Sequence, residues 1–200
     1  MKNLLLAAAS MAALTTLASP ANALIINATT NGNSVDTSFS GPGVLAADVD
    51  FSAFAGRAAS VILDVTLEAE DLGSSLDFNG VMTNGNFFEN LKSFTLILDG
   101  TTFSAVGSVV PFFSLGETVL GAAGDERIDI MFGEGGEPAG VELGDVGFGG
   151  TNFGIDISNF VAGHSFSIGL IGEVPEPGVL SLLGLGALIL GARQHRRLSK

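Results

Sequence analysis

The middle of the chain alternates apolar and polar residues with a period of two, which is the pattern of a β-strand with one buried face. Between Val61 and Glu70 the odd-numbered residues are all apolar, whereas Asp64 and Glu68 lie on the other face. The same alternation recurs in residues 92–99, 127–132, 153–157 and 166–170. Glycine-rich stretches separate these runs, and none of the runs has a helical period. The pattern predicts an all-β domain over residues 24–172, an antiparallel β-sandwich with a jelly-roll-like arrangement, with a barrel as the alternative.

One turn between two of these runs has a distinctive sequence. Asp99-Gly100 follows the run 92–99, and residues 101–106 offer a second extended segment. An Asp-Gly pair tolerates the positive φ angles of a type I′ turn, which joins adjacent antiparallel strands. We therefore expect a β-hairpin centred on this pair.

The charge of the chain excludes several classes of protein. Residues 24–173 contain three basic residues against 20 acidic ones, a formal charge of −17. Such a domain repels phosphate, so nucleic-acid binding through a basic surface is excluded.

The chain has no Cys, which rules out disulfides, thiolate metal sites and a Cys nucleophile. All 15 Phe lie in the same region, which is enough apolar material for a core and not the composition of a disordered acidic tail.

The first 23 residues have the organisation of a secretory signal peptide. Lys2 supplies the positive charge, an apolar stretch follows, and Ala21 and Ala23 form the small-x-small pattern that a signal peptidase cuts. Cleavage after Ala23 would leave Leu24 as the mature N-terminus. We expect export through the Sec translocon, with signal peptidase as a processing partner.

Residues 173–200 have three successive parts. Val174-Pro175-Glu176-Pro177 is followed by the uncharged apolar segment 178–192 and by a tail, residues 193–200, that contains Arg193, Arg196 and Arg197. An apolar helix of this length spans about 22 Å, somewhat less than the roughly 30 Å hydrocarbon core. The segment is therefore predicted to be one short transmembrane helix, and the basic tail is predicted to stay in the cytoplasm.

The two prolines have a direct conformational effect. Each proline fixes its own φ near −65° and pushes the residue before it toward extended geometry. Pro175, Glu176 and Pro177 should thus form a stiff, extended strut that holds one carboxylate at the membrane surface. A plain anchor with a helix-breaking linker is the alternative interpretation.

This three-part tail resembles the PEP-CTERM sorting signal of Gram-negative bacteria. The resemblance implies recognition of Pro175, Glu176 and Pro177 by an exosortase, a membrane-embedded, protease-like sorting enzyme. It also implies transient anchoring in the inner membrane, followed by localisation at the cell surface or in the extracellular matrix. Proteins with this signal are associated with exopolysaccharide, biofilm or floc. Gln194 and His195 interrupt the basic cluster and are a mild departure from the pattern.

The exported region offers little for catalysis. No Gly-x-Ser-x-Gly, His-Glu-x-x-His or phosphate-loop motif occurs, and its one histidine, His164, is in register with the apolar face of a strand, as expected for a structural residue. Calcium is the ion that its carboxylates suit. Asp125, Glu126 and Asp129 are one set of candidate ligands. Asp48 with Asp50 is another, and Glu134 with Glu137 lies in a glycine-rich loop that would wrap an ion. A solvated acidic surface is the alternative explanation of all these carboxylates.

These observations predict a non-enzymatic, exosortase-sorted protein of the surface or extracellular matrix, without a cofactor unless calcium binds. Its expected partners are the exosortase, the membrane during transit and extracellular polysaccharide. A calcium-dependent carbohydrate-binding or adhesive module is the first alternative. A secreted glycan hydrolase with two carboxyl groups is the second.

Overall fold

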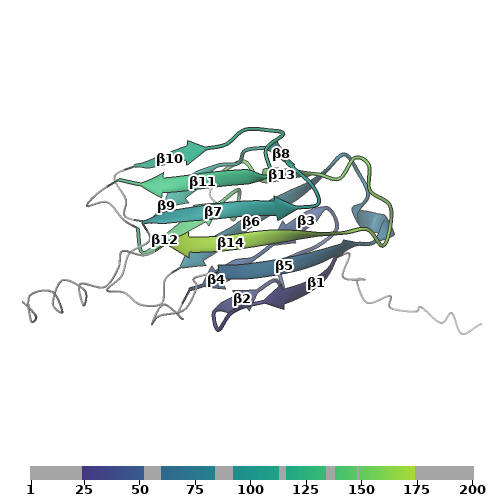
Figure 1. The fold of residues 1–200 in the computed structure, drawn as a ribbon, viewed down its shortest axis with the longest axis horizontal. Helices are drawn as coiled ribbons and strands as arrows, with labels where there is room; N and C mark the ends of the chain where they lie inside the picture. The colour runs from purple at the N-terminus through teal and green to yellow at the C-terminus, as the bar shows by residue number, and fades with distance from the viewer. Residues whose placement is uncertain are drawn as a thin grey trace, which may run out of the picture.

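The structure is a computed structural model that describes residues 24–51, 60–83, 92–112, 116–133, 138–147 and 149–173. These residues form two β-sheets that lie face to face (Figure 1). The first sheet contains, in spatial order, β1 (Leu24–Thr29), β5 (Ser60–Leu67), β14 (Ser165–Glu173), β7 (Ser93–Asp99), β11 (Arg127–Phe132) and β10 (Glu117–Leu120). The second has the order β2 (Ser34–Asp36), β4 (Asp48–Asp50), β6 (Ser75–Thr83), β12 (Gly140–Leu143) and β9 (Val109–Pro111). Strands β3 (Val44–Ala46) and β13 (Phe153–Asp156) also pair with β6, and β8 (Phe103–Ala105) pairs with β13. The predicted all-β class is confirmed.

The alternating residues build the core as expected. In β5, Val61, Leu63, Val65 and Leu67 are all buried, while Ile62 and Asp64 are exposed. The alternating apolar residues of β7, β11, β13 and β14 that face inward are buried in the same way, and they belong to one cluster that both sheets supply. Phe51, which follows β4, meets Phe94 of β7 across the interface, with ring centroids 5.9 Å apart. The hydrophobic pattern therefore determines which face of each strand points inward.

The second sheet is not wholly antiparallel. All pairs of the first sheet are antiparallel, but β3 and β4 both run parallel to β6. The expectation of an antiparallel arrangement throughout is thus wrong for this sheet, and the jelly-roll-like connectivity stays a prediction. Each of the two parallel strands has only three residues, too few to show an alternation in the sequence.

One glycine permits this parallel contact. Ala47, between β3 and β4, runs alongside β6 at Gly80, where an added Cβ would meet the backbone oxygen of Ala47. The amide of Ala47 donates a hydrogen bond to the oxygen of Asn79 at 3.0 Å. A residue without a side chain is therefore required for β6 to accept the strand pair at this distance.

The predicted hairpin at Asp99-Gly100 does not form. Gly100 has the positive φ of 92° that the turn chemistry suggested. However, β7 pairs with β14 and β11, whereas the following strand β8 pairs with β13 in the other sheet. The reason is burial, because Phe103 of β8 is fully buried and packs against Phe153, with ring centroids 6.3 Å apart. The turn carries the chain from one sheet to the other.

The first long strand also ends earlier than predicted. β5 stops at Leu67, and Ala69–Asp71 form a single 3₁₀ turn, η1. Asp71 is buried, and its carboxylate accepts hydrogen bonds from the amides of Glu68 at 2.9 Å and Gly43 at 3.3 Å. These bonds turn the chain at the strand end and connect it to the loop before β3.

Two predicted segments lie outside the described residues: the signal peptide, 1–23, and the apolar helix, 178–192. Within the ranges that the structure describes, no helix is long and apolar enough to span a membrane.

Candidate functional site

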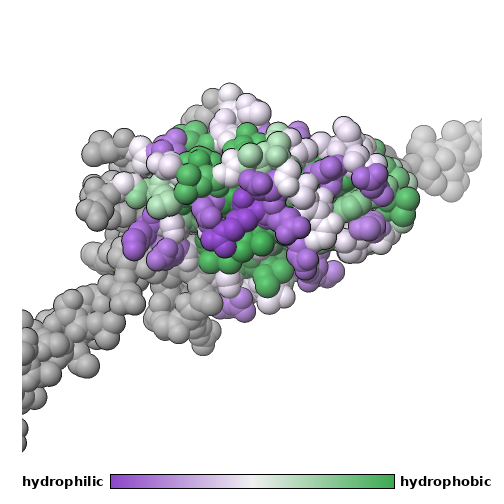
Figure 2. All heavy atoms as spheres, turned by 45° about the horizontal axis from the view of Figure 1, so that its top comes forward, coloured by the Kyte–Doolittle hydropathy of each residue, from purple (hydrophilic) through white to green (hydrophobic). Residues whose placement is uncertain are grey.

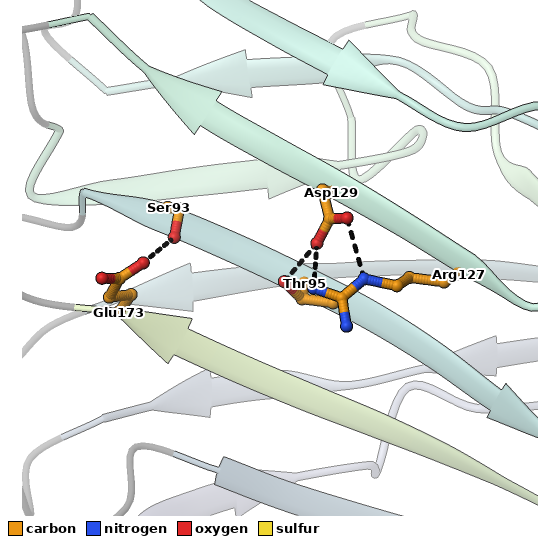
Figure 3. A network of polar contacts seen from close by, with 5 residues as sticks. All are labelled: Ser93, Thr95, Arg127, Asp129 and Glu173. Atoms are coloured by element: carbon orange, nitrogen blue, oxygen red, sulfur yellow. Dashed lines mark hydrogen bonds and ion pairs between the residues drawn. The ribbon is translucent and has the colours of Figure 1, made fainter.

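The end of strand β14 is the point where the folded domain meets the C-terminal segment. β14 lies between β5 and β7, and its pairing with β7 continues to the last position, Glu173 opposite Ser93. The hydroxyl of Ser93 donates a 2.7 Å hydrogen bond to Oε2 of Glu173 (Figure 3). Lys92 Nζ lies 3.8 Å from Oε1 of the same side chain. The backbone amide of Lys92 donates to the oxygen of Glu173 at 2.8 Å. We call Lys92, Ser93 and Glu173 the exit clamp.

The exit clamp also reaches the next strand. The backbone oxygen of Lys92 accepts a hydrogen bond from the amide of Phe132, at the end of β11, at 3.1 Å. The ends of β14, β7 and β11 are thereby connected through one residue. The ion pair itself is exposed, with 60% of both side chains accessible, so it is screened by solvent and contributes little by itself.

A second polar group lies on the same face of the sheet. Arg127 of β11 donates two hydrogen bonds to Asp129, from Nε at 2.8 Å and from Nη2 at 2.7 Å, and Thr95 Oγ1 of β7 donates to Asp129 at 2.7 Å (Figure 3). The hydrogen bond from Arg127 lowers the pKa of Asp129 below its usual value, and the same contact raises the pKa of Arg127. Asp129 therefore stays ionised and paired.

Both polar groups line a groove of about 360 Å³, together with the exposed apolar side chains of Leu120 and Met131. Figure 2, with the β10–β11 edge turned forward, shows hydrophilic side chains in the middle of this view with hydrophobic ones above and below them. Lys92 and Arg127 are the only lysine and arginine within the described ranges. The sequence shows that basic residues are rare in this acidic domain. Only the fold shows that Lys92 and Arg127 line the same groove.

The structure does not assemble the first set of calcium candidates. Asp129 is held by Arg127 and Thr95, and Oδ2 of Asp125 accepts a hydrogen bond from the amide of Ala122 at 2.8 Å. Among the described residues, no three His, Asp or Glu side chains form a group that could hold a metal ion. Asp125, Glu126 and Asp129 therefore do not form one either.

The pair Asp48 and Asp50 lies at a different place. β2 and β4 put Asp36 opposite Asp48, and all three carboxylates line a shallow groove of about 340 Å³. Oδ1 of Asp48 accepts a hydrogen bond from the amide of Val81 at 2.9 Å, and the amide of Ser38 lowers the pKa of Asp36. Glu134 and Glu137 lie outside the described residues.

His164 directly precedes β14, and its side chain is exposed. Its ring stacks on Phe160, with centroids 3.8 Å apart and planes inclined by 21°. Phe160 in turn contacts the buried Phe166 at the start of β14. The side chain thus lies on the surface and not on the apolar face where the sequence placed it, and its structural role stays a prediction.

Pro175, Glu176 and Pro177, the basic residues Arg193, Arg196 and Arg197, and the cleavage residues Ala21 and Ala23 lie outside the described residues, so their predicted roles stay predictions. The comparison with protein families gives one result: the PEP-CTERM protein-sorting motif matches residues 173–197. No curated protein and no solved structure matches the chain. The motif indicates an exported protein that an exosortase sorts. The chain is therefore a PEP-CTERM sorting motif-containing protein, whose motif begins at the last residue of strand β14.

Proposed function

We propose that this protein is a non-enzymatic component of the cell surface or extracellular matrix, delivered by the exosortase and associated with exopolysaccharide or biofilm. The observation that supports this most is the direct continuation of an acidic β-sandwich into the sorting motif, from Glu173 onward. The domain would act as a stable, soluble unit whose charge of −17 keeps copies apart. The Sec translocon and signal peptidase would process the N-terminus, and the exosortase the C-terminus.

The surface of the described domain supports a passive role. Most of its carboxylates are exposed. The cations Lys92 and Arg127 both contact carboxylates of the same chain. Divalent cations could bridge the remaining acids to anionic polysaccharide, since carboxylate oxygens suit hard cations.

Mass spectrometry of the mature protein from its native host tests this proposal. We expect an N-terminus at Leu24, loss of the basic tail from Arg193 onward, and recovery in the surface or matrix fraction. A strain without the exosortase should retain Lys200 and keep the protein in the membrane fraction. Recovery of the full tail from the wild-type matrix fraction would contradict the proposal.

A calcium-dependent carbohydrate-binding or adhesive module is the second candidate, and the groove lined by Asp36, Asp48 and Asp50 favours it. The three carboxylates give this hollow a negative charge that would attract a divalent cation. They do not form a metal-binding group as they stand in the structure, so they would have to move closer together to hold the ion. If calcium binds the native state, the melting midpoint should rise with calcium concentration and fall again with a chelator. The variant Asp48→Asn should reduce the rise, whereas Asp145→Asn, on the loop after β12, should leave it unchanged. An unchanged midpoint in wild-type protein would reject this candidate.

A further inference from the structure

The sorting motif follows the fold without a spacer. Glu173 is both the first residue of the motif match and the last residue of β14, and it is still paired with Ser93. Only Val174 separates it from Pro175. The residues just before the prolines are thus part of a central strand, between β5 and β7.

The short connection also limits how far the domain lies from the predicted membrane segment. Four residues separate Glu173 from Gly178, where the apolar stretch begins. At about 3.1 Å per residue, an extended proline-rich chain spans roughly 15 Å over this distance. The headgroup layer is itself roughly 5–8 Å thick. If residues 178–192 form the predicted membrane helix, little space would remain between the folded domain and the membrane for an enzyme cleft.

An enzyme that acts on a peptide chain needs it free of neighbouring strands, so cutting rates follow the population of the locally opened form. In the closed form, Ile171 is paired with both Ser60 and Thr95, and Glu173 is paired with Ser93. A cleft that holds several residues before the prolines would require this part of β14 to leave the sheet.

We propose that Lys92 and Ser93 are positioning residues for exosortase processing. They hold the end of β14 on β7 through Glu173, and the motif becomes fully accessible to the enzyme when residues 171–173 detach. The inference rests on the proposed sorting by an exosortase and adds to it a dependence on the folded domain. Lys92 and Ser93 precede the motif in the sequence by about 80 residues, and only the sheet brings them to it.

The decisive test is a reversible cross-link at the exit clamp. The chain has no Cys, so S93C/E173C contains two thiols and they face each other at the last pair of β14 and β7. The matched control is D99C/S167C, which joins the same two strands on the same face at the other end of their pairing. Each precursor is accumulated in a host without the exosortase and oxidised, the exosortase is then supplied, and loss of the tail is followed by mass spectrometry.

We expect oxidised S93C/E173C to be processed at least about tenfold more slowly than the same protein after reduction. The comparison within one variant removes any direct effect of replacing Glu173. Oxidised and reduced D99C/S167C should be processed at the same rate. Thermal melting of all four forms shows whether the domain is folded.

A second pair of variants tests whether weakening the exit clamp accelerates processing, and neither variant alters the motif. S93A removes the hydroxyl that donates to Glu173, and we expect processing to accelerate about two- to tenfold. S167A is the matched control, because Ser167 donates a hydrogen bond of the same kind to Asp64, 2.6 Å away, near the start of β14. It should leave the rate unchanged.

The outcomes separate the two levels of the proposal. If the wild-type protein is processed and the oxidised exit cross-link is processed equally fast, the inference is overturned and sorting by the exosortase stands. If the wild-type protein keeps its tail in the presence of the exosortase, both are overturned.

Discussion

Arg127 and Asp129 stand two residues apart on strand β11 and form two hydrogen bonds of 2.8 and 2.7 Å on the outer face of the sheet. The fork of the guanidinium matches the carboxylate, and Thr95 of the neighbouring strand donates a third bond to Asp129 at 2.7 Å. The hydrogen bond from Thr95 connects β11 with β7, and Arg127 holds the carboxylate that accepts it.

This group predicts a specific pH dependence. The pKa of Asp129 is lowered in the folded protein, so its stabilising effect is complete above the unfolded value of about 3.9 and is lost as the pH falls through the folded pKa. We expect Asp129→Asn to lower the free energy of unfolding at pH 7 by up to about 1 kcal/mol, since the pair is partly exposed. Urea denaturation from pH 7 to pH 2 should show wild type and variant converging below about pH 4.

Asp36 and Asp156 also have lowered pKa values, but they do not affect the difference between wild type and variant. Their pKa values are lowered by the backbone amides of Ser38 and Ser158, contacts that Asp129→Asn leaves in place. They contribute equally to both curves. A difference between wild type and variant that stays constant down to pH 2 would contradict the assignment.

The contact between Phe51 and Phe94 predicts a large effect on stability. Both rings are fully buried; Phe94 belongs to β7 of the first sheet, and Phe51 directly follows β4 of the second. Phe94→Ala should reduce the free energy of unfolding by about 3–5 kcal/mol through lost burial and a cavity between the sheets. Phe39→Ala, at an exposed position, should change it by less than about 0.5 kcal/mol. Chemical denaturation of both variants measures these changes. If the two variants lost a similar free energy of unfolding, Phe94 would not lie in the core as described.

The parallel contact at Gly80 makes a third prediction. A methyl group there would meet the backbone oxygen of Ala47, which cannot move aside as a flexible side chain can. Gly80→Ala should cost about 1–3 kcal/mol or more. Gly41→Ala is the control, because nothing lies within 4 Å of its added Cβ. Equal midpoints for the two variants in thermal melting would indicate that β3 and β4 do not pair with β6 as described.

The buried carboxylate of Asp71 leads to a fourth prediction. Asp71→Ala leaves the amides of Glu68 and Gly43 without their acceptor, which should cost about 1–3 kcal/mol. Glu70→Ala, in the same 3₁₀ turn but exposed, should stay within about 0.5 kcal/mol of wild type. Hydrogen exchange at the amide of Glu68 provides a local measurement, and unchanged protection in Asp71→Ala would argue against the contact.

The alternation of residues predicted the buried faces correctly because the period of a strand is two and the core is apolar. Val61 to Leu67 and Phe166 to Leu170 are buried on the predicted side. The sorting motif was also evident, since it depends on a short linear order of prolines, apolar residues and arginines and requires no fold.

Which strands become neighbours was decided only by the tertiary structure. Asp99-Gly100 has hairpin chemistry, yet burial of Phe103 in the second sheet separates β7 from β8. In the same way, the exit clamp joins Lys92 and Ser93 to Glu173, residues about 80 positions apart in the chain. Local sequence determines the conformation and the inward face of each strand, whereas pairing between distant strands depends on how all the apolar faces can be buried together, and no single segment contains that information.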